Sequence, residues 1–165
     1  MPGAKISPQG SGTFFMNSSN EDPIFGKVIS TYTTREAVAD GFLIELLPTV
    51  SAELRDAGIR VPAYLTTGVW EKYVEVPEGM EGEQDVAGRL MDILNMFRLA
   101  VKSSKNHCDF IEFKFVCLLP NKGDWERNEK RQGDGLRLIT LHATIRARDF
   151  DDPSPAIFIM KPDED

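Results

Sequence analysis

The hydrophobic pattern of this chain changes period once, and that change limits the folds it can adopt. Between Gln84 and Lys102 the apolar residues recur at helical spacing, on one face of a helix about 28 Å long. From Phe110 to Leu119 they instead alternate with polar residues, as on a strand with one buried face. A long amphipathic helix followed by a strand predicts a helix packed on a sheet. The apolar helical face comprises Val86, Leu90, Ile93, Leu94, Phe97, Ala100 and Val101.

Two further strand-like stretches follow, 136–146 and 157–161. A charged, glycine-bracketed segment, 121–135, separates the first two strands and is expected to be a mobile hairpin loop. The turn at 149–155 separates the last two. Consecutive strands with short connections favour an antiparallel meander. The sequence therefore predicts an α+β fold, with N-terminal short helices and the long helix packed on a three-stranded antiparallel sheet formed by the C-terminal third.

Three short helices are predicted before the long one. Thr33 and Glu36 have the spacing of a capping box, and Gly41 suits the left-handed position after the helix that they begin. Ser51 is placed to cap a second short helix and Thr66 a third.

The first 22 residues are rich in Gly, Ser, Pro and Asn and have no hydrophobic period. They predict a disordered extension, followed by a single α+β domain over 23–165. No apolar run approaches the roughly 20 residues that cross a bilayer, and no secretion signal is recognisable. Two cysteines, Cys108 and Cys117, are too few for a disulfide framework. We therefore expect a cytoplasmic protein without membrane attachment.

Charge is unevenly distributed along the chain, whose formal net charge is −7. Seven acids and two bases lie between Glu71 and Asp92, whereas seven bases and four acids lie between Lys122 and Arg148. The net charge argues against a nucleic-acid-binding protein that works by neutralising phosphates. Two alternatives remain open for the acidic residues: they form a surface that binds a protein partner, or they form a solvated face that only keeps the protein soluble.

A weaker alternative places nucleic acid against the basic loop 122–137. Basic side chains and one tryptophan in a loop can contact single strands by charge and stacking. Acidic residues alternate with these bases along the loop and weaken its positive electrostatic potential. The candidate residues are Trp125, Arg127, Lys130 and Arg131, with Arg137 beside them.

Cys117 and His142 lie on neighbouring predicted strands and form the one conceivable nucleophilic pair. A thiol that faces a core is normally inert, because burial disfavours the thiolate. Their spacing, with that of His107 and Cys108, does not match a zinc site. Packing roles are therefore expected for Cys117 and His142.

Clustered carboxylates suggest oxygen-ligand metal binding at two places, Asp149–Asp152 and Asp163–Asp165. These clusters flank the last strand at opposite ends, so they are not expected to share an ion, and neither matches a calcium-binding loop. The chain has no phosphate-binding loop and no dinucleotide fingerprint. The sequence thus predicts no metal and no cofactor.

Four segments resemble a family of uncharacterised proteins found in bacteria, phages and plasmids. They are Tyr32–Gly41, which ends Ala-Asp-Gly, Val61–Trp70, Gln84–Leu94, which contains Gly-Arg-Leu, and Ile159–Asp165, which ends Pro-Asp-Glu-Asp. The chain departs from the family at Thr34, where Arg is common, and at Met91, where Trp is usual, so no role that depends on those residues is transferred. The family carries a domain-of-unknown-function label, so the resemblance implies a mobile-element context but no activity.

The resemblance draws attention to charged residues that packing does not explain. If the sheet end lies over the long helix, Arg89 could pair with the terminal acids as a structural clasp, or the same residues could bind a partner. The candidates are Asp85, Arg89, Asp92, Asp163, Glu164 and Asp165.

The leading hypothesis is a non-enzymatic accessory or protein-interaction protein of a mobile element, acting through its acidic surface. One version is mimicry of nucleic-acid charge. The rival is an enzyme whose pocket gathers Asp85, Asp92 or the C-terminal acids, with raised carboxyl pKa values. The third hypothesis is the nucleic-acid-contacting regulator. Partner identity and oligomeric state stay open.

Overall fold

The computed structural model describes residues 21–22, 26–27, 32–46, 51–105 and 109–164. The chain divides into two units, residues 1–32 and 33–165. In the first unit, β1 (Glu21–Asp22) pairs with β2 (Gly26–Lys27) in antiparallel fashion. The domain boundary after residue 22 stays a prediction.

Two of the three caps predicted for the short helices are present, whereas Ser51 is the first residue of its helix and not its cap. Thr33 and Glu36 form the predicted capping box, and Gly41 has the expected positive φ of 82°. Thr66 accepts a hydrogen bond from Val69 N–H, and Asp85 accepts one from Gly88 N–H at the start of the long helix. The helices are α1 (Thr34–Ala39), α2 (Ser51–Asp56), α3 (Thr67–Val69), which continues into the π-helical turn η3 (Trp70–Val74), and α4 (Val86–Ser103).

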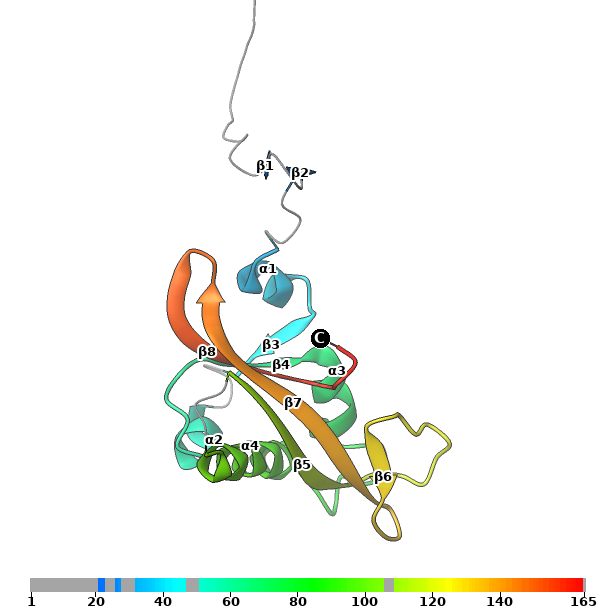
Figure 1. Ribbon diagram of the computed structural model, residues 1–165. Coiled ribbons are helices and arrows are strands. Elements are labelled where there is room, and N and C mark those ends of the chain that lie inside the picture. The colour runs from blue at the N-terminus through cyan, green and yellow to red at the C-terminus, as the bar shows by residue number, and fades with distance from the viewer. Residues whose placement is uncertain (1–20, 23–25, 28–31, 47–50, 106–108, 165) are drawn as a thin grey trace, which may run out of the picture. The chain divides into compact units, whose positions relative to one another are not determined.

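The predicted α+β fold and the antiparallel meander of the C-terminal third are confirmed (Figure 1). The number of strands was underestimated, because the sheet has six in the described part of the chain instead of three. Its order is β3-β4-β8-β7-β5, and β6 also pairs with β7. The strands are β3 (Leu43–Glu45), β4 (Ala63–Thr66), β5 (Phe110–Leu118), β6 (Glu129–Arg131), β7 (Leu136–Asp149) and β8 (Asp152–Met160).

Two of the strands that the predicted sheet lacks, β3 and β4, come from the N-terminal half. β4 runs parallel to β8, pairing Ala63 with Ile157 across about 90 residues of sequence. It has only four residues and three of them are buried, so its sequence does not alternate. Short runs of this kind cannot be assigned from periodicity, and only the pairing with a distant strand identifies this one.

The last hairpin is longer than the sequence suggested. β8 begins at Asp152, inside the segment expected to be a turn, and contains Pro153 and Pro155. β4 pairs only with residues 157–159, so no strand of the described residues pairs with the outer edge of this first part of β8. Proline is tolerated there because no ladder hydrogen bond is lost.

The main core lies between the sheet and the helices α2, η3 and α4, with α2 and α4 in contact at one face (Figure 1). Four α4 side chains, Leu90, Ile93, Leu94 and Phe97, are buried there. A smaller cluster on the opposite face joins Tyr64, Ala156, Phe158 and Met160 to Val38 of α1. The same face of β5 and β7 is more exposed, since the even-numbered residues of β5 lie outside the core.

Candidate functional site

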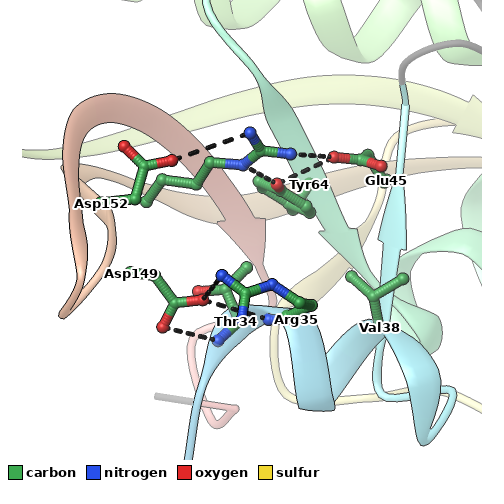
Figure 2. Close-up of a pocket in the computed structure, with 8 residues that line it drawn as sticks. Thr34, Arg35, Val38, Glu45, Tyr64, Asp149 and Asp152 are labelled. Atoms are coloured by element: carbon green, nitrogen blue, oxygen red, sulfur yellow. Dashed lines mark hydrogen bonds and ion pairs between the residues drawn. The ribbon is translucent and has the colours of Figure 1, made fainter.

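A polar cavity of about 170 Å³ lies between α1, β3, β4 and the β7–β8 hairpin (Figure 2). Arg148 is at its centre: Nε donates to Tyr64 Oη at 2.7 Å, and Nη2 donates to Glu45 Oε1 at 2.8 Å. Tyr64 Oη also donates to Glu45 at 2.9 Å, and Asp152 lies 3.8 Å from Arg148 Nη1. Burial raises the pKa of Tyr64, so its hydroxyl stays protonated at neutral pH. The cavity therefore holds charges that already neutralise one another.

Asp149 has a structural role at the edge of this cavity. Its side chain is 6% exposed and accepts from the backbone N–H groups of Thr34 and Arg35, at 3.3 and 3.4 Å. The Arg35 side chain reaches Asp149 and Asp151 from outside, at 4.0 and 3.6 Å. Asp149 thus fastens α1 to the end of β7. This carboxylate is occupied by protein donors, and the described residues contain no group of three His, Cys, Asp or Glu that could hold a metal ion.

Arg89 lies inside the protein, where it is 4% exposed. Nε donates to Tyr73 O at 3.0 Å, and Nη1 donates to Leu118 O at 2.9 Å and to Gln84 Oε1 at 2.6 Å. Nη2 lies 3.3 Å from the Cys117 sulfur. The guanidinium therefore connects α4, η3 and the end of β5 through neutral acceptors.

The predicted clasp between Arg89 and the tail is wrong for the tail acids that the structure describes. Glu164 accepts from the Thr66 hydroxyl at 2.6 Å and from Lys161 N–H at 2.8 Å. A Cβ atom at Gly68 would collide with the Glu164 carboxylate, so glycine lets the tail approach α3. Glu164 is therefore held in place, but at the start of α3 and not at Arg89. Asp165 lies outside the described residues, and Asp163 lines a groove described below.

One cluster of charged residues in the described part of the chain was not predicted as a site. Glu129 has a fully buried side chain and accepts from Arg137 Nη1 at 2.6 Å and from Tyr73 Oη at 2.6 Å. Lys72 Nζ lies 2.8 Å from the same carboxylate. Arg137 also donates to Asp124 Oδ1 at 2.9 Å. We call Lys72, Tyr73, Asp124, Glu126, Glu129, Arg137 and Lys161 the buried ion network.

Glu126 closes this network at its outer side. Its carboxylate accepts from Lys72 at 2.9 Å and from Lys161 at 3.0 Å, so it connects η3 to the end of β8. Desolvation works against the charged form of Glu126, but the two lysines outweigh it and lower its pKa. The hydrogen bond from Arg137 lowers the pKa of Asp124.

The network corrects the expectation that 121–135 is a mobile loop. Residues 129–131 form β6, and Trp125 stacks on the buried guanidinium of Arg137, 4.1 Å from its ring centroid. The signal was present in the sequence: Arg137 shares strand parity with Ile139 and Leu141, so a charge occupies an inward position. A charge in an inward strand position predicts a buried partner.

The predicted nucleic-acid residues are divided between two places. The Arg131 guanidinium lies over the Trp125 ring, 5.3 Å from the ring centroid. Both residues line a shallow hollow together with Arg137. Arg127 and Lys130 instead line a groove of about 550 Å³ on the exposed face of β5 and β7. Lys130 and Arg131 separate because successive strand residues point to opposite faces. The groove is lined by Glu112, Lys114, Arg127, Asn128, Lys130, Thr140, Pro162 and Asp163.

Cys117 and His142 do not form a catalytic pair. Cys117 faces the core, and His142 is on the other face of the sheet, 3.2 Å from Glu112. Burial raises the pKa of the Cys117 thiol to about 11. The expected packing role of Cys117 agrees with this geometry, and the His142 ring packs edge-on against Phe110, with ring centroids 4.6 Å apart.

In the acidic segment, defined as residues 71–92, the acids and the bases differ in their exposure to solvent. Its two bases are Lys72 and Arg89; Lys72 belongs to the buried ion network and Arg89 is buried. Its seven acids are all exposed, and within the described residues none forms an ion pair with a base. These acids are Glu71, Glu75, Glu78, Glu81, Glu83, Asp85 and Asp92.

The carboxylates proposed for an enzyme site do not converge. Asp85 caps α4, and Asp92 lies about two turns further along the same helix. Partial burial raises the pKa of Asp92, an effect that the charge of Arg89 opposes. Asp163 and Glu164 follow the end of β8, where Asp163 lines the groove and Glu164 has the partners given above.

Comparisons with known proteins give no match: no family model, curated protein or solved structure is significantly similar to the chain. The resemblance to uncharacterised phage and plasmid proteins therefore stays a prediction. None of the helices in the described ranges is long and apolar enough to cross a membrane.

Proposed function

We propose that this protein is a non-enzymatic binding protein that attaches to a basic surface of a partner protein through the acidic segment. The observation that carries the proposal is the internal use of Lys72 and Arg89. Folding removes both bases from a stretch of seven acids, so the exposed charge of this stretch is more negative than its sequence suggests.

Exposed carboxylates that form no ion pair favour association with a basic surface. They attract a positively charged patch over about a Debye length and speed its encounter with the protein. They also discriminate against acidic partners, because like charges brought together cost several kcal/mol. A mobile-element accessory protein of this kind would act by occupying the basic surface of a host protein, which is also what mimicry of nucleic-acid charge requires.

The catalytic alternative has less support. The acids suggested for it lie at separate places, and those of the polar cavity are paired with Arg148, Arg35 or backbone N–H groups. A carboxylate whose oxygens already accept hydrogen bonds from protein donors is poorly placed to take a proton from a substrate.

The test uses a tagged full-length chain as bait in bacterial lysate, followed by affinity measurement with the captured protein. The variant carries Glu75→Gln, Glu78→Gln and Glu81→Gln. We expect it to bind at least about tenfold more weakly at low salt, and wild-type binding to fall steeply as salt rises.

The matched control changes the same number of charges elsewhere, with Asp56→Asn, Asp134→Asn and Asp151→Asn. It should bind within about twofold of the wild type, because the acidic segment is intact. Equal loss in both variants, or capture that does not depend on salt, would contradict the proposal.

A second candidate function is contact with nucleic acid in the groove. Its support is the pair Arg127 and Lys130, which form no ion pair within the described residues and line the groove together. An Arg127→Gln, Lys130→Gln variant should then lose a mobility shift with single-stranded DNA that Trp125→Ala retains. Absence of a shift with wild-type protein at low salt would remove this candidate.

A further inference from the structure

The strand β5 is the end strand of the sheet, and no strand of the described residues pairs with its outer side. Leu119 N–H donates to Gly135 O, and Ile145 N–H donates to Asp109 O, at the two ends of the β5–β7 ladder. Hydrogen-bonded and non-bonded pairs alternate in such a ladder, so the odd-numbered residues of β5 bond to β7. The even-numbered residues therefore turn their N–H and C=O groups to the free edge.

The even-numbered side chains also share the exposed face of the sheet. Phe110 and Val116 are unusually exposed for apolar residues, at 45% and 41%. Between them lie Glu112 and Lys114, whose side chains are half exposed and 3.4 Å apart. From Phe110 to Val116 the outward order is thus apolar, acidic, basic, apolar. On an antiparallel copy of the strand this order is reversed, so an acid lies opposite a base.

We infer that two copies of this chain associate by antiparallel pairing of β5 with β5, about a two-fold axis at Phe113. In this register Glu112 lies opposite Lys114 of the second copy, and Phe110 lies opposite Val116. Both kinds of pair occur twice. Because even-numbered residues from both chains face the shared edge, each pair can exchange two backbone hydrogen bonds, roughly eight in all. The result is one continuous sheet across the dimer.

The charges on β5 favour this register over the two symmetric registers that are shifted by one residue. A shift of the axis to Lys114 places two lysines opposite each other, and a shift to Glu112 places two glutamates opposite each other. Like charges in directly opposed positions destabilise a strand pair, and opposite charges stabilise it. Lysine on an exposed edge ordinarily discourages such pairing. Here Glu112 supplies the opposite charge, so the edge accepts its own copy.

The experiment measures the mass and dimer dissociation constant of the full-length chain by sedimentation over a concentration series. Glu112→Lys and Lys114→Glu should each weaken the dimer at least about tenfold, because both cross-strand pairs become repulsive. The double exchange, Glu112→Lys with Lys114→Glu, should restore dimerisation to near the wild-type level. Asp151→Lys, at the hairpin tip beyond the end of β5, makes the same charge change as Glu112→Lys and should leave the dimer unchanged.

Two further measurements separate this edge from a general surface contact. Val116→Pro removes an N–H that faces the free edge but none that bonds to β7, so the monomer should fold and the dimer should be lost. Amide hydrogen exchange should slow with concentration at the even-numbered residues Phe110, Glu112, Lys114 and Val116 and not at the odd-numbered ones, whose amides are already bonded to β7. A chain that stays monomeric at its highest soluble concentration, or a dimer indifferent to these variants, would overturn the inference. A monomer would leave the edge to a strand of another protein.

Discussion

Two charge-rich regions of this protein use their charges in opposite ways. In the buried ion network the carboxylate of Glu129 is shared by Lys72, Tyr73 and Arg137. In the acidic segment the seven acids lie on the surface, Asp92 being partly desolvated, and none forms an ion pair with a base among the described residues. The two regions meet at Lys72, which is in the acidic segment by sequence and in the network by contact.

The difference shows why composition alone does not identify a binding surface. Buried charges make removal of a partner costly, because an uncompensated charge is left in a poorly solvated place. Exposed, unpaired charges contribute little to stability and stay available to another molecule. The network therefore holds the fold of 122–137, whereas the acidic segment keeps its charges on the surface.

The largest effect should come from breaking the network at its centre. Glu129→Gln leaves Arg137 and Lys72 without a buried counter-charge, and we expect a loss of about 3–5 kcal/mol in the free energy of unfolding. Urea denaturation measures it, with Glu78→Gln as the exposed control, expected within about 0.5 kcal/mol. Glu129→Met combined with Arg137→Met should recover part of the loss. Similar stabilities for Glu129→Gln and Glu78→Gln would refute the contrast.

Arg89 is the next test, because it is a buried charge held by neutral acceptors. Arg89→Ala leaves carbonyl groups of Tyr73 and Leu118 without their donor and opens space in the core, so we expect a loss of about 3 kcal/mol. Lys102→Ala, exposed on the same helix, should change stability by less than about 0.5 kcal/mol. Thermal unfolding followed by circular dichroism compares the two. Equal melting temperatures would show that the internal bonds of Arg89 contribute nothing.

Acidification should weaken the outer part of the network. The pKa of Glu126 is lowered from its ordinary value of 4.5, so its stabilising contribution is complete above about pH 4.5 and is lost as pH falls through its folded-state pKa. Asp124 behaves in the same direction from 3.8. Urea midpoints between pH 7 and pH 3 measure the loss, which should be smaller in Glu126→Gln. An unchanged pH profile in that variant would refute the assignment.

The smallest effect is expected in the acidic segment. The triple change Glu75→Gln, Glu78→Gln and Glu81→Gln removes exposed charges without ionic partners, so the free energy of unfolding should stay within about 0.5 kcal/mol. The same variant is the one expected to lose its binding partner. Chemical denaturation and the binding assay, done on one preparation, would separate recognition from stability. A large loss of stability would show that these acids have structural contacts.

Much of the local structure could be predicted because its causes are local. The cap at Thr33, the left-handed Gly41 and the amphipathic α4 depend on residues within a few positions of one another. β4 could not be predicted, because a four-residue strand is defined by its pairing with β8. The tail illustrates the same limit: the sequence predicts that its acids have a structural partner, but the hydroxyl that donates to Glu164 belongs to Thr66, and Arg89 is bonded elsewhere.

By itself, the sequence determined the α+β class, the long helix, the meander and the uneven distribution of charge, because hydrophobic period and composition act along the chain. Only the tertiary structure decided which charges remain outside. Burial is a property of packing between distant segments, and it removed Lys72, Arg89 and Arg137 from the surface. The same packing left the even-numbered side of β5 free, with Glu112 and Lys114 in positions that complement a second copy.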